Sequence, residues 1–334
     1  MFELQSILQA LAERPHEPAV LCTLVRVEGS SYRTPGARML YYGDGFRTGM
    51  ISGGCLENDT ALRAQQILRS DRPAETIIYD TTSENDLVWG VGLGCHGRVH
   101  VFIEKLPRPP RWTAGLAANL ASRQPTSLAV VYRADNSALL GTHLTADLPA
   151  AAVSGVEIFR EIIAPPPSLV IFGAGDDAQP LARLALELGW HVTIADPRPA
   201  QATPDRFPGA HRLVTGPVEN LTGLVDPVPE ALGVVMTHHY VHDLPLMRQL
   251  LPRPLAYLGL LGPRMRTEKI LATLEAEGLS ITPEARARLH APVGLDLGAT
   301  TPEGVALSIL AEMQARLAGR APIHLRDRCA PIHG

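Results

Sequence analysis

The sequence predicts an α/β protein with two domains, a mixed α/β domain followed by a doubly wound parallel sheet. The chain has 334 residues, of which 46% are hydrophobic, and this is enough to fill two cores. Proline-rich breaks interrupt it near 105–111 and at 164–168. After the second break, strand-like and helix-like segments alternate, as they do in parallel sheets. We therefore predict domains at 1–164 and 165–334.

The composition excludes several classes of protein. The 30 basic and 34 acidic residues leave a net charge of −4 with no Lys/Arg block, which argues against a nucleic-acid partner. Four cysteines are too few for a disulfide scaffold, which indicates a reducing compartment. The N-terminus resembles an amphipathic helix rather than a signal peptide, and no apolar run approaches the roughly 20 residues that span a bilayer. We therefore expect a cytoplasmic protein with no membrane partner.

The first domain should mix helices with strands. Hydrophobic periodicity predicts two helices, near 3–14 and at 57–70. Apolar and alternating segments bounded by turn residues predict strands at 19–27, 38–42, 98–103 and 127–132. Turn-rich sequence after the last of these strands would complete the domain.

Two cysteines of this domain lie in glycine-lined turns. Cys55 follows Gly53 and Gly54, and Cys95 follows Gly94. Glycine allows positive φ and lets a bulky ligand approach the backbone closely, so these thiols should be exposed to chemistry. Because Cys55 would stand at the N-terminus of the 57–70 helix, its position also favours anions.

The other two cysteines are not expected to take part. Cys22 lies in an apolar strand and should belong to the core, whereas Cys329 lies in the C-terminal tail. Neither Cys55 nor Cys95 has a second cysteine at C-x-x-C spacing, which argues against a structural zinc site.

The second domain carries a nucleotide-binding pattern. The run Gly173-Ala174-Gly175-Asp176-Asp177-Ala178 matches G-x-G-x-x-A between a strand at 169–172 and a helix that Gly189 closes. A strand at 191–195 ends at Asp196, the position of the acid that binds a ribose in such units. The pattern predicts a C-terminal Rossmann-like domain in which Gly173, Gly175, Asp176 and Asp196 contact a cofactor.

Two features of this domain bear on its ligand. Asp176 and Asp177 suit the helix dipole but compete for the place of a pyrophosphate, so either the ligand brings a cation or the pocket no longer holds an ordinary dinucleotide. His238 follows a strand predicted at 233–237 and should lie in the pocket at the carboxyl edge of the sheet. Further strands are expected at 212–215 and 256–260. A helix is expected from Pro302 to about Leu317, with Thr301 as its N-cap.

These motifs together resemble the XdhC/CoxI family of accessory factors for molybdenum hydroxylases such as xanthine dehydrogenase. The resemblance runs from about residue 25 to 315. Besides the two cysteine turns and the Rossmann turn, it is carried by Gly29–Ala37, Val235–His238, Tyr257–Arg264 and His290–Ala299. Many members have Gly-His-Val-Gly where this chain has Gly175-Asp176-Asp177-Ala178, which is a departure from the family pattern.

The resemblance implies a chaperone that binds the molybdenum cofactor, supports its sulfuration and delivers it to the apo-hydroxylase. A cysteine desulfurase would supply the sulfur, and the chain would form a homo-oligomer, a dimer. Cys55 and Cys95 would be molybdenum ligands or sulfur relays, since soft thiolates suit this metal, and the neighbouring glycines would line the cofactor. Such a protein would not turn over a substrate by itself, so we expect a chaperone rather than an enzyme.

Other interpretations stay open at this stage. The Rossmann unit alone would fit an NAD(P)-dependent oxidoreductase, with NAD(P) or another nucleotide bound there. Cys55 and Cys95 would instead form a reversible disulfide in a thiol-redox sensor. Arg33 and Arg38 either clamp a phosphate or form a solvated surface pair.

Overall fold

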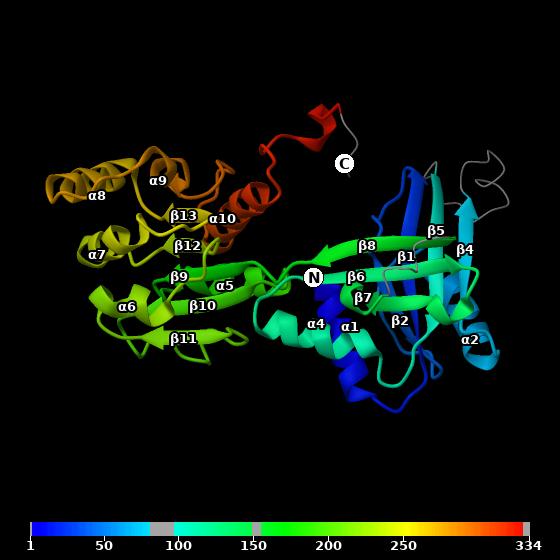
Figure 1. Cartoon of the computed structure of the whole chain (residues 1–334). Helices are drawn as coiled ribbons and strands as arrows, with labels where there is room; N and C mark the ends of the chain where they lie inside the picture. The colour runs from blue at the N-terminus through cyan, green and yellow to red at the C-terminus, as the bar shows by residue number, and fades with distance from the viewer. Residues whose placement is uncertain (1, 81–96, 149–154, 330–334) are drawn as a thin grey trace. The chain divides into compact units, whose positions relative to one another are not determined.

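The computed structural model describes residues 2–80, 97–148 and 155–329 (Figure 1). Its contacts divide the chain into two compact units, Met1–Pro165 (unit 1) and Pro166–Ile332 (unit 2). None of the described helices is both long and apolar enough to cross a membrane.

Unit 1 is built on an antiparallel sheet with the strand order β3-β2-β1-β5-β4. Its strands are β1 (Ala19–Gly29), β2 (Arg38–Tyr42), β3 (Arg47–Gly49), β4 (Ala74–Asp80) and β5 (Gly97–Lys105). Helix α2 (Glu57–Arg69) buries Ala64 and Ile67 against one face of the sheet, in a core that includes Cys22. The predicted core position of Cys22 is confirmed, and burial raises the pKa of its thiol.

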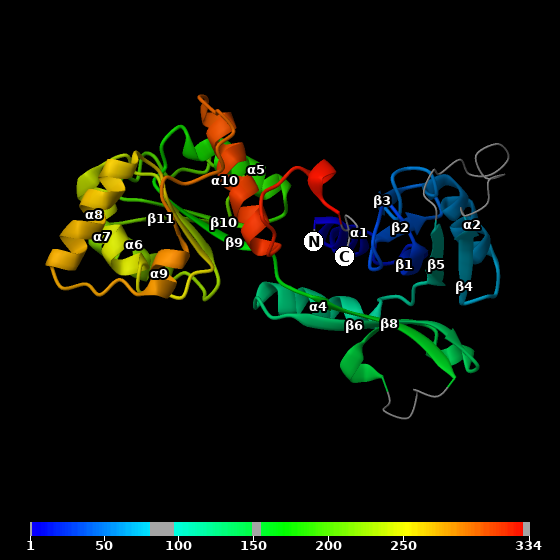
Figure 2. The same ribbon diagram turned by 90° about the horizontal axis from the view of Figure 1, so that it is seen from above.

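A smaller sheet with the order β7-β6-β8 completes unit 1. Its strands are β6 (Thr126–Ala134), β7 (Gly141–Leu144) and β8 (Val156–Ile163), with short 3-10 turns at Ser137–Leu139 and Thr145–Asp147. Helix α4 (Arg111–Ala121) packs on this sheet, as Figure 2 shows, and it shares a core with α1 (Phe2–Glu13). The sequence predicted only the first of these strands, because β8 lacks a clean alternation and α4 starts directly after a proline-rich run.

Arg38 links the two sheets of unit 1. Only 4% of its side chain is exposed, and its guanidinium pairs with Glu161 on β8. The two roles considered for Arg38, phosphate clamp and solvated surface residue, are therefore both wrong, since packing makes it a buried structural cation. Arg33 pairs instead with Glu3 of α1, with 2.5 Å between nitrogen and oxygen.

Unit 2 contains a parallel sheet with the order β11-β10-β9-β12-β13-β14, most of which can be followed in Figure 1. Its strands are β9 (Ser168–Phe172), β10 (His191–Asp196), β11 (Arg212–Thr215), β12 (Leu232–Val235), β13 (Tyr257–Leu260) and β14 (Leu289–His290). Every residue of β9 is buried, as expected for a central strand covered on both faces.

Helices cover both faces of this sheet. One core contains side chains of α5 (Ala178–Glu187) and α10 (Pro302–Leu317), and the other contains side chains of α6 (Val218–Val225), α7 (Tyr240–Leu250) and α8 (Arg264–Ala276). A short helix α9 (Pro283–Ala287) and a 3-10 turn at Leu325–Asp327 are the remaining described elements. The order reverses between β9 and β12, which confirms the predicted Rossmann-like doubly wound sheet.

Capping residues mark the ends of two helices of unit 2. The side chain of Thr301 accepts a hydrogen bond from the amide of Gly304, so the predicted N-cap of α10 is confirmed. Gly189 follows α5 with φ of 75°, as a closing glycine should. The helices α6 to α9 were not predicted, since α7 contains Pro245 and α8 buries only Thr267, Ile270 and Leu274.

Candidate functional site

The predicted thiol site of unit 1 lies in the segment 50–56 between β3 and α2, which we call the Cys55 turn. Cys55, Gly53 and Gly54 are all exposed there. Gly54 has φ of 109°, which favours glycine, and no atom lies within 4 Å of where its Cβ would be. The structure thus brings these three predicted residues together on an open surface.

A buried carboxylate holds the Cys55 turn in shape. Oε1 of Glu57 accepts hydrogen bonds from the amides of Ile51 (3.1 Å) and Ser52 (2.7 Å). Oε2 of Glu57 accepts the hydroxyl of Ser52 at 2.5 Å. Burial opposes the charge of Glu57, but the hydrogen bonds from Ser52 and the backbone outweigh it and keep the pKa of Glu57 below its usual value. Glu57 is the first residue of the predicted helix 57–70, but nothing in the sequence alone assigned it this role.

Ser52 extends this network toward the thiol. Its Oγ accepts hydrogen bonds from the amides of Gly54 (3.2 Å) and Leu56 (3.1 Å). The sulfur of Cys55 lies 3.6 Å from the same oxygen and donates to it as a thiol. The turn is therefore held in a defined shape around Cys55, which is itself an exposed residue.

The second predicted thiol, Cys95, and its neighbour Gly94 lie outside the described residues. Gly97, the first residue of β5, pairs with Gly29 of β1. A Cβ on Gly97 would lie 2.3 Å from the carbonyl oxygen of Ser30, so only glycine fits at this point. Within the described ranges, no group of three or more His, Cys, Asp or Glu side chains could hold a metal ion.

The predicted cofactor residues of unit 2 gather at the carboxyl ends of β9, β10 and β12. Gly173 follows β9 with φ of 117°, and its missing Cβ would lie 2.5 Å from the carbonyl oxygen of Met236 after β12. Gly175 is less constrained, because its missing Cβ would come close only to Oδ1 of Asp177 (2.7 Å), the end of a side chain that can move. Close backbone packing therefore requires glycine at position 173.

Each carboxylate at the start of α5 has a side-chain partner. Asp176 pairs with Arg206 at 2.9 Å, and Arg206 also donates to the carbonyl of Ala174. Asp177, in the turn after β9, pairs with Nε2 of His238, which follows β12, at 2.7 Å. The sequence pointed to His238 but missed Arg206, since no periodic or motif signal marks a loop arginine that lies 30 residues from its partner.

Asp196 is buried and fully engaged within unit 2. Its carboxylate accepts hydrogen bonds from the amide of Ala174 (2.7 Å) and from the amide, Nε and a terminal nitrogen of Arg198 (2.8, 2.9 and 2.9 Å). Burial raises the pKa of Asp196, but Arg198 and the amides lower it more, and the net pKa is below the usual value. These bonds anchor the glycine turn to the end of β10.

We expect Asp196 to make unit 2 sensitive to acid. A carboxylate with a lowered folded pKa stabilises the fold fully above its unfolded pKa of about 3.9, and this contribution is lost as the pH falls through the folded pKa. Denaturant unfolding of Asp196→Asn and wild type should therefore differ clearly near neutral pH and converge as the pH falls through the lowered folded pKa of Asp196. The exposed Asp205→Asn is the control, and a difference independent of pH would contradict the assignment.

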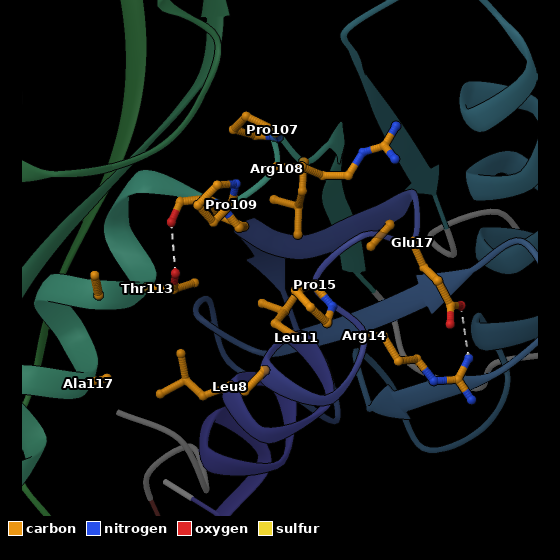
Figure 3. A pocket seen from close by; sticks show the side chains of 15 residues that line it. Leu8, Leu11, Arg14, Pro15, Glu17, Pro107, Arg108, Pro109, Thr113 and Ala117 are labelled. Carbon is orange, nitrogen blue, oxygen red and sulfur yellow. Dashed lines mark hydrogen bonds and ion pairs between the residues drawn. The ribbon is translucent and has the colours of Figure 1, made fainter.

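A pocket of about 290 Å³ lies elsewhere in unit 1, between α1, α4 and the proline-rich segment after β5 (Figure 3). Leu8, Leu11 and Pro109 give it an apolar wall, and the Arg14–Glu17 ion pair lies at its edge. None of the predicted site residues lines it.

Comparisons with known proteins match both units. The model described as the XdhC Rossmann domain matches residues 169–313, and that of the XdhC and CoxI family matches residues 12–80. A protein of Bacillus subtilis (strain 168), named as a probable xanthine dehydrogenase subunit, is 34% identical over 332 residues, which cover 94% of this chain and 97% of that protein. The chain belongs to the XdhC and CoxI family.

Two further comparisons support the assignment of this chain to the XdhC and CoxI family. The Escherichia coli (strain K12) protein named "Molybdenum cofactor insertion chaperone PaoD" is 28% identical over 296 residues, which cover 88% of this chain and 82% of that protein. A crystal structure of a xanthine dehydrogenase from Bacillus halodurans is 29% identical, with a TM-score of 0.79 and coverage of 95% of this chain and 96% of that one. The resemblance and the fold class predicted from the sequence are thus confirmed.

Proposed function

We propose that this chain is an accessory factor that binds the molybdenum cofactor, supports its sulfuration and delivers it to a molybdenum hydroxylase such as xanthine dehydrogenase. The observation that carries the proposal is the exposed Cys55 thiol in a preformed glycine turn. The names of two relatives, a molybdenum cofactor insertion chaperone and a probable xanthine dehydrogenase subunit, support the choice of cofactor and partner.

The residues of the Cys55 turn fit this cofactor chemically. A cysteine sulfur is a soft ligand of the kind that suits a sulfur-bound molybdenum centre, and bound cofactor would supply that centre. The open space above Gly54 leaves room for a bulky group beside the sulfur. The chain's own residues then hold and orient the ligand, with Glu57 and Ser52 fixing the backbone under Cys55.

We propose that Cys95 serves the same site. Cys95 stands two residues before Gly97 in the sequence. Gly97 packs closely on the backbone of Ser30, just after the end of β1. Two residues further along, Tyr32 lies against Gly53 of the Cys55 turn. A mass shift in oxidant that requires both cysteines would support this proximity, and it would also test the redox-sensor alternative.

Replacement of Cys55 by serine should abolish cofactor binding. We expect wild-type protein from a molybdate-supplied host to carry molybdenum and pterin, whereas Cys55→Ser should carry neither, because an alcohol is a far poorer ligand for a soft metal. Elemental analysis and pterin fluorescence after oxidation measure both. Cys329→Ser, at another exposed cysteine, is the control and should retain the cofactor. Equal loading of Cys55→Ser would exclude Cys55 as the ligand.

The finer parts of the proposal need separate measurements. Sulfur transfer from a cysteine desulfurase is tested with labelled sulfur, and delivery by activation of a purified apo-hydroxylase. Light scattering tests whether the chain is a homodimer, and fractionation of the source cells tests the cytoplasmic location.

Unit 2 suggests a second candidate, an NAD(P)-dependent oxidoreductase, but its paired carboxylates weaken that interpretation. Asp177 is held by His238 at the place that a pyrophosphate would take. We expect weak binding of NAD(H) by wild type and about fivefold tighter binding by Asp177→Gly, because a negative charge is removed from the helix N-terminus. Calorimetry measures both affinities, with Asp205→Asn as control. Tight NAD(H) binding and reductase turnover by wild type would favour the oxidoreductase.

A further inference from the structure

Tyr32 is an exposed aromatic residue that lies directly on the Cys55 turn. A Cβ placed on Gly53 would be 3.4, 3.5 and 3.6 Å from Cδ1, Cγ and Cε1 of the Tyr32 ring. Three adjacent ring atoms are nearly equidistant from one point only when that point lies over the face of the ring, not at its edge. One face of the ring therefore turns toward Gly53, at van der Waals distance from the position that its missing Cβ would take.

The rest of the Tyr32 ring is open to solvent and could contact a ligand. Tyr32 is 61% exposed, so much of the side chain is in contact with solvent. Its neighbour Arg33 is tied to Glu3 of α1, which fixes the chain beside it. On the other side, Ser52 and Glu57 hold the turn that supports the ring. The ring is thus supported from both segments while much of its surface faces solvent.

The position of this ring relative to Cys55 defines what it could bind. Gly53 and Cys55 are two residues apart, so their Cα atoms are separated by no more than about 7 Å. A fused, planar heterocycle can span that distance, with its flat ring on the aromatic face and a soft sulfur or metal end at the thiol. Aromatic rings stack on such heterocycles through offset face contacts.

We propose that Tyr32 is a ligand-binding residue of the Cys55 site, and that its exposed face stacks on the planar pterin ring of the cofactor. This inference rests on the proposed function and adds the group that selects the organic part of the ligand. Cys55 would recognise the soft end, and Tyr32 would distinguish a ring-bearing cofactor from molybdate or a simple thiomolybdate.

Affinity measurements on the full chain test this role. The probe is molybdenum cofactor released from a purified hydroxylase and titrated into apo-protein, with protein-bound cofactor separated by ultrafiltration and quantified by its pterin fluorescence after oxidation. Tyr32→Ala should bind about tenfold more weakly than wild type, because it loses the stacking contact. Tyr32→Phe keeps the ring and should bind within about twofold of wild type.

A matched control separates stacking from general loss of an aromatic side chain. Phe46 is also exposed in unit 1 (41%) and packs on Tyr42 and Arg14, and Phe46→Ala should leave the affinity unchanged. Circular dichroism melting of each variant checks that the fold is intact.

The outcomes distinguish the inference from the function on which it rests. If wild type binds the cofactor but Tyr32→Ala binds it equally well, the role of Tyr32 is wrong and the proposed function stands. If wild type binds neither molybdenum nor pterin, the proposed function fails and the inference fails with it. Weaker binding by Tyr32→Ala together with rescue by Tyr32→Phe supports the stacking role.

Discussion

Gly173→Ala should destabilise unit 2 by about 3 kcal/mol or more. Gly173 has φ of 117°, a conformation that strains any residue with a Cβ, and that Cβ would lie 2.5 Å from the carbonyl oxygen of Met236. Neither partner can yield cheaply, because the amide of Gly173 is bonded to Ala195 and the amide of Met236 to Phe172, both at 2.8 Å. Denaturant unfolding followed by tryptophan fluorescence and circular dichroism measures the loss.

A second glycine substitution in the same unit provides the control. Gly223 lies inside α6 with no atom within 4 Å of its missing Cβ. Gly223→Ala should therefore stabilise unit 2 by about 0.5 to 1 kcal/mol, since alanine loses less conformational entropy in a helix. Equal effects of the two substitutions would show that the crowding at Gly173 is not what constrains the glycine turn.

Glu57→Ala should destabilise unit 1 by about 3 kcal/mol and abolish cofactor binding, because it leaves the amides of Ile51 and Ser52 without their acceptor. Glu57→Gln keeps an acceptor oxygen for both amides and should cost about 1 kcal/mol. Urea unfolding measures the stabilities, and cofactor loading at a temperature where every variant is folded measures the effect on the site.

The pH dependence gives an independent test of the same carboxylate. Since the pKa of Glu57 is below its usual value, its contribution is full above the unfolded pKa of about 4.3 and is lost as the pH falls through the folded pKa. The stability difference between wild type and Glu57→Gln should shrink accordingly in acid. The control Glu13→Ala, at an exposed position of α1, should leave the free energy of unfolding almost unchanged. If Glu57→Ala loads cofactor as wild type does, the turn does not depend on Glu57.

Local signals explain why much of unit 2 is predictable from the sequence. Its glycine turn, the apolar strand before it and the Thr301 cap depend on residues close together in the chain, and spacing alone reveals them. The same is true of Cys55, whose flanking glycines indicate an exposed turn. In contrast, β8 has a weak alternation, and it forms because β6 supplies its hydrogen-bonding partner.

The partners of the charged residues could not be predicted in this way. Arg38 and Glu161 are 123 residues apart, and their pairing depends on how two sheets pack. His238 meets Asp177 across 61 residues, because neighbouring parallel strands end at the same edge. Asp196 carries the expected spacing from the glycine turn, but only the structure shows that Arg198 and Ala174 occupy its oxygens.

The sequence by itself therefore determined the family resemblance, the doubly wound sheet of unit 2 and the exposed thiol at position 55. Each of these depends on residue types at short, fixed spacings, which set local backbone conformation. Only the tertiary structure decided that Glu57 and Ser52 hold the Cys55 turn and that the Tyr32 ring faces Gly53. The Tyr32 contact, like the pairing of the unit 2 carboxylates, joins segments far apart in the chain, and such contacts are set by packing.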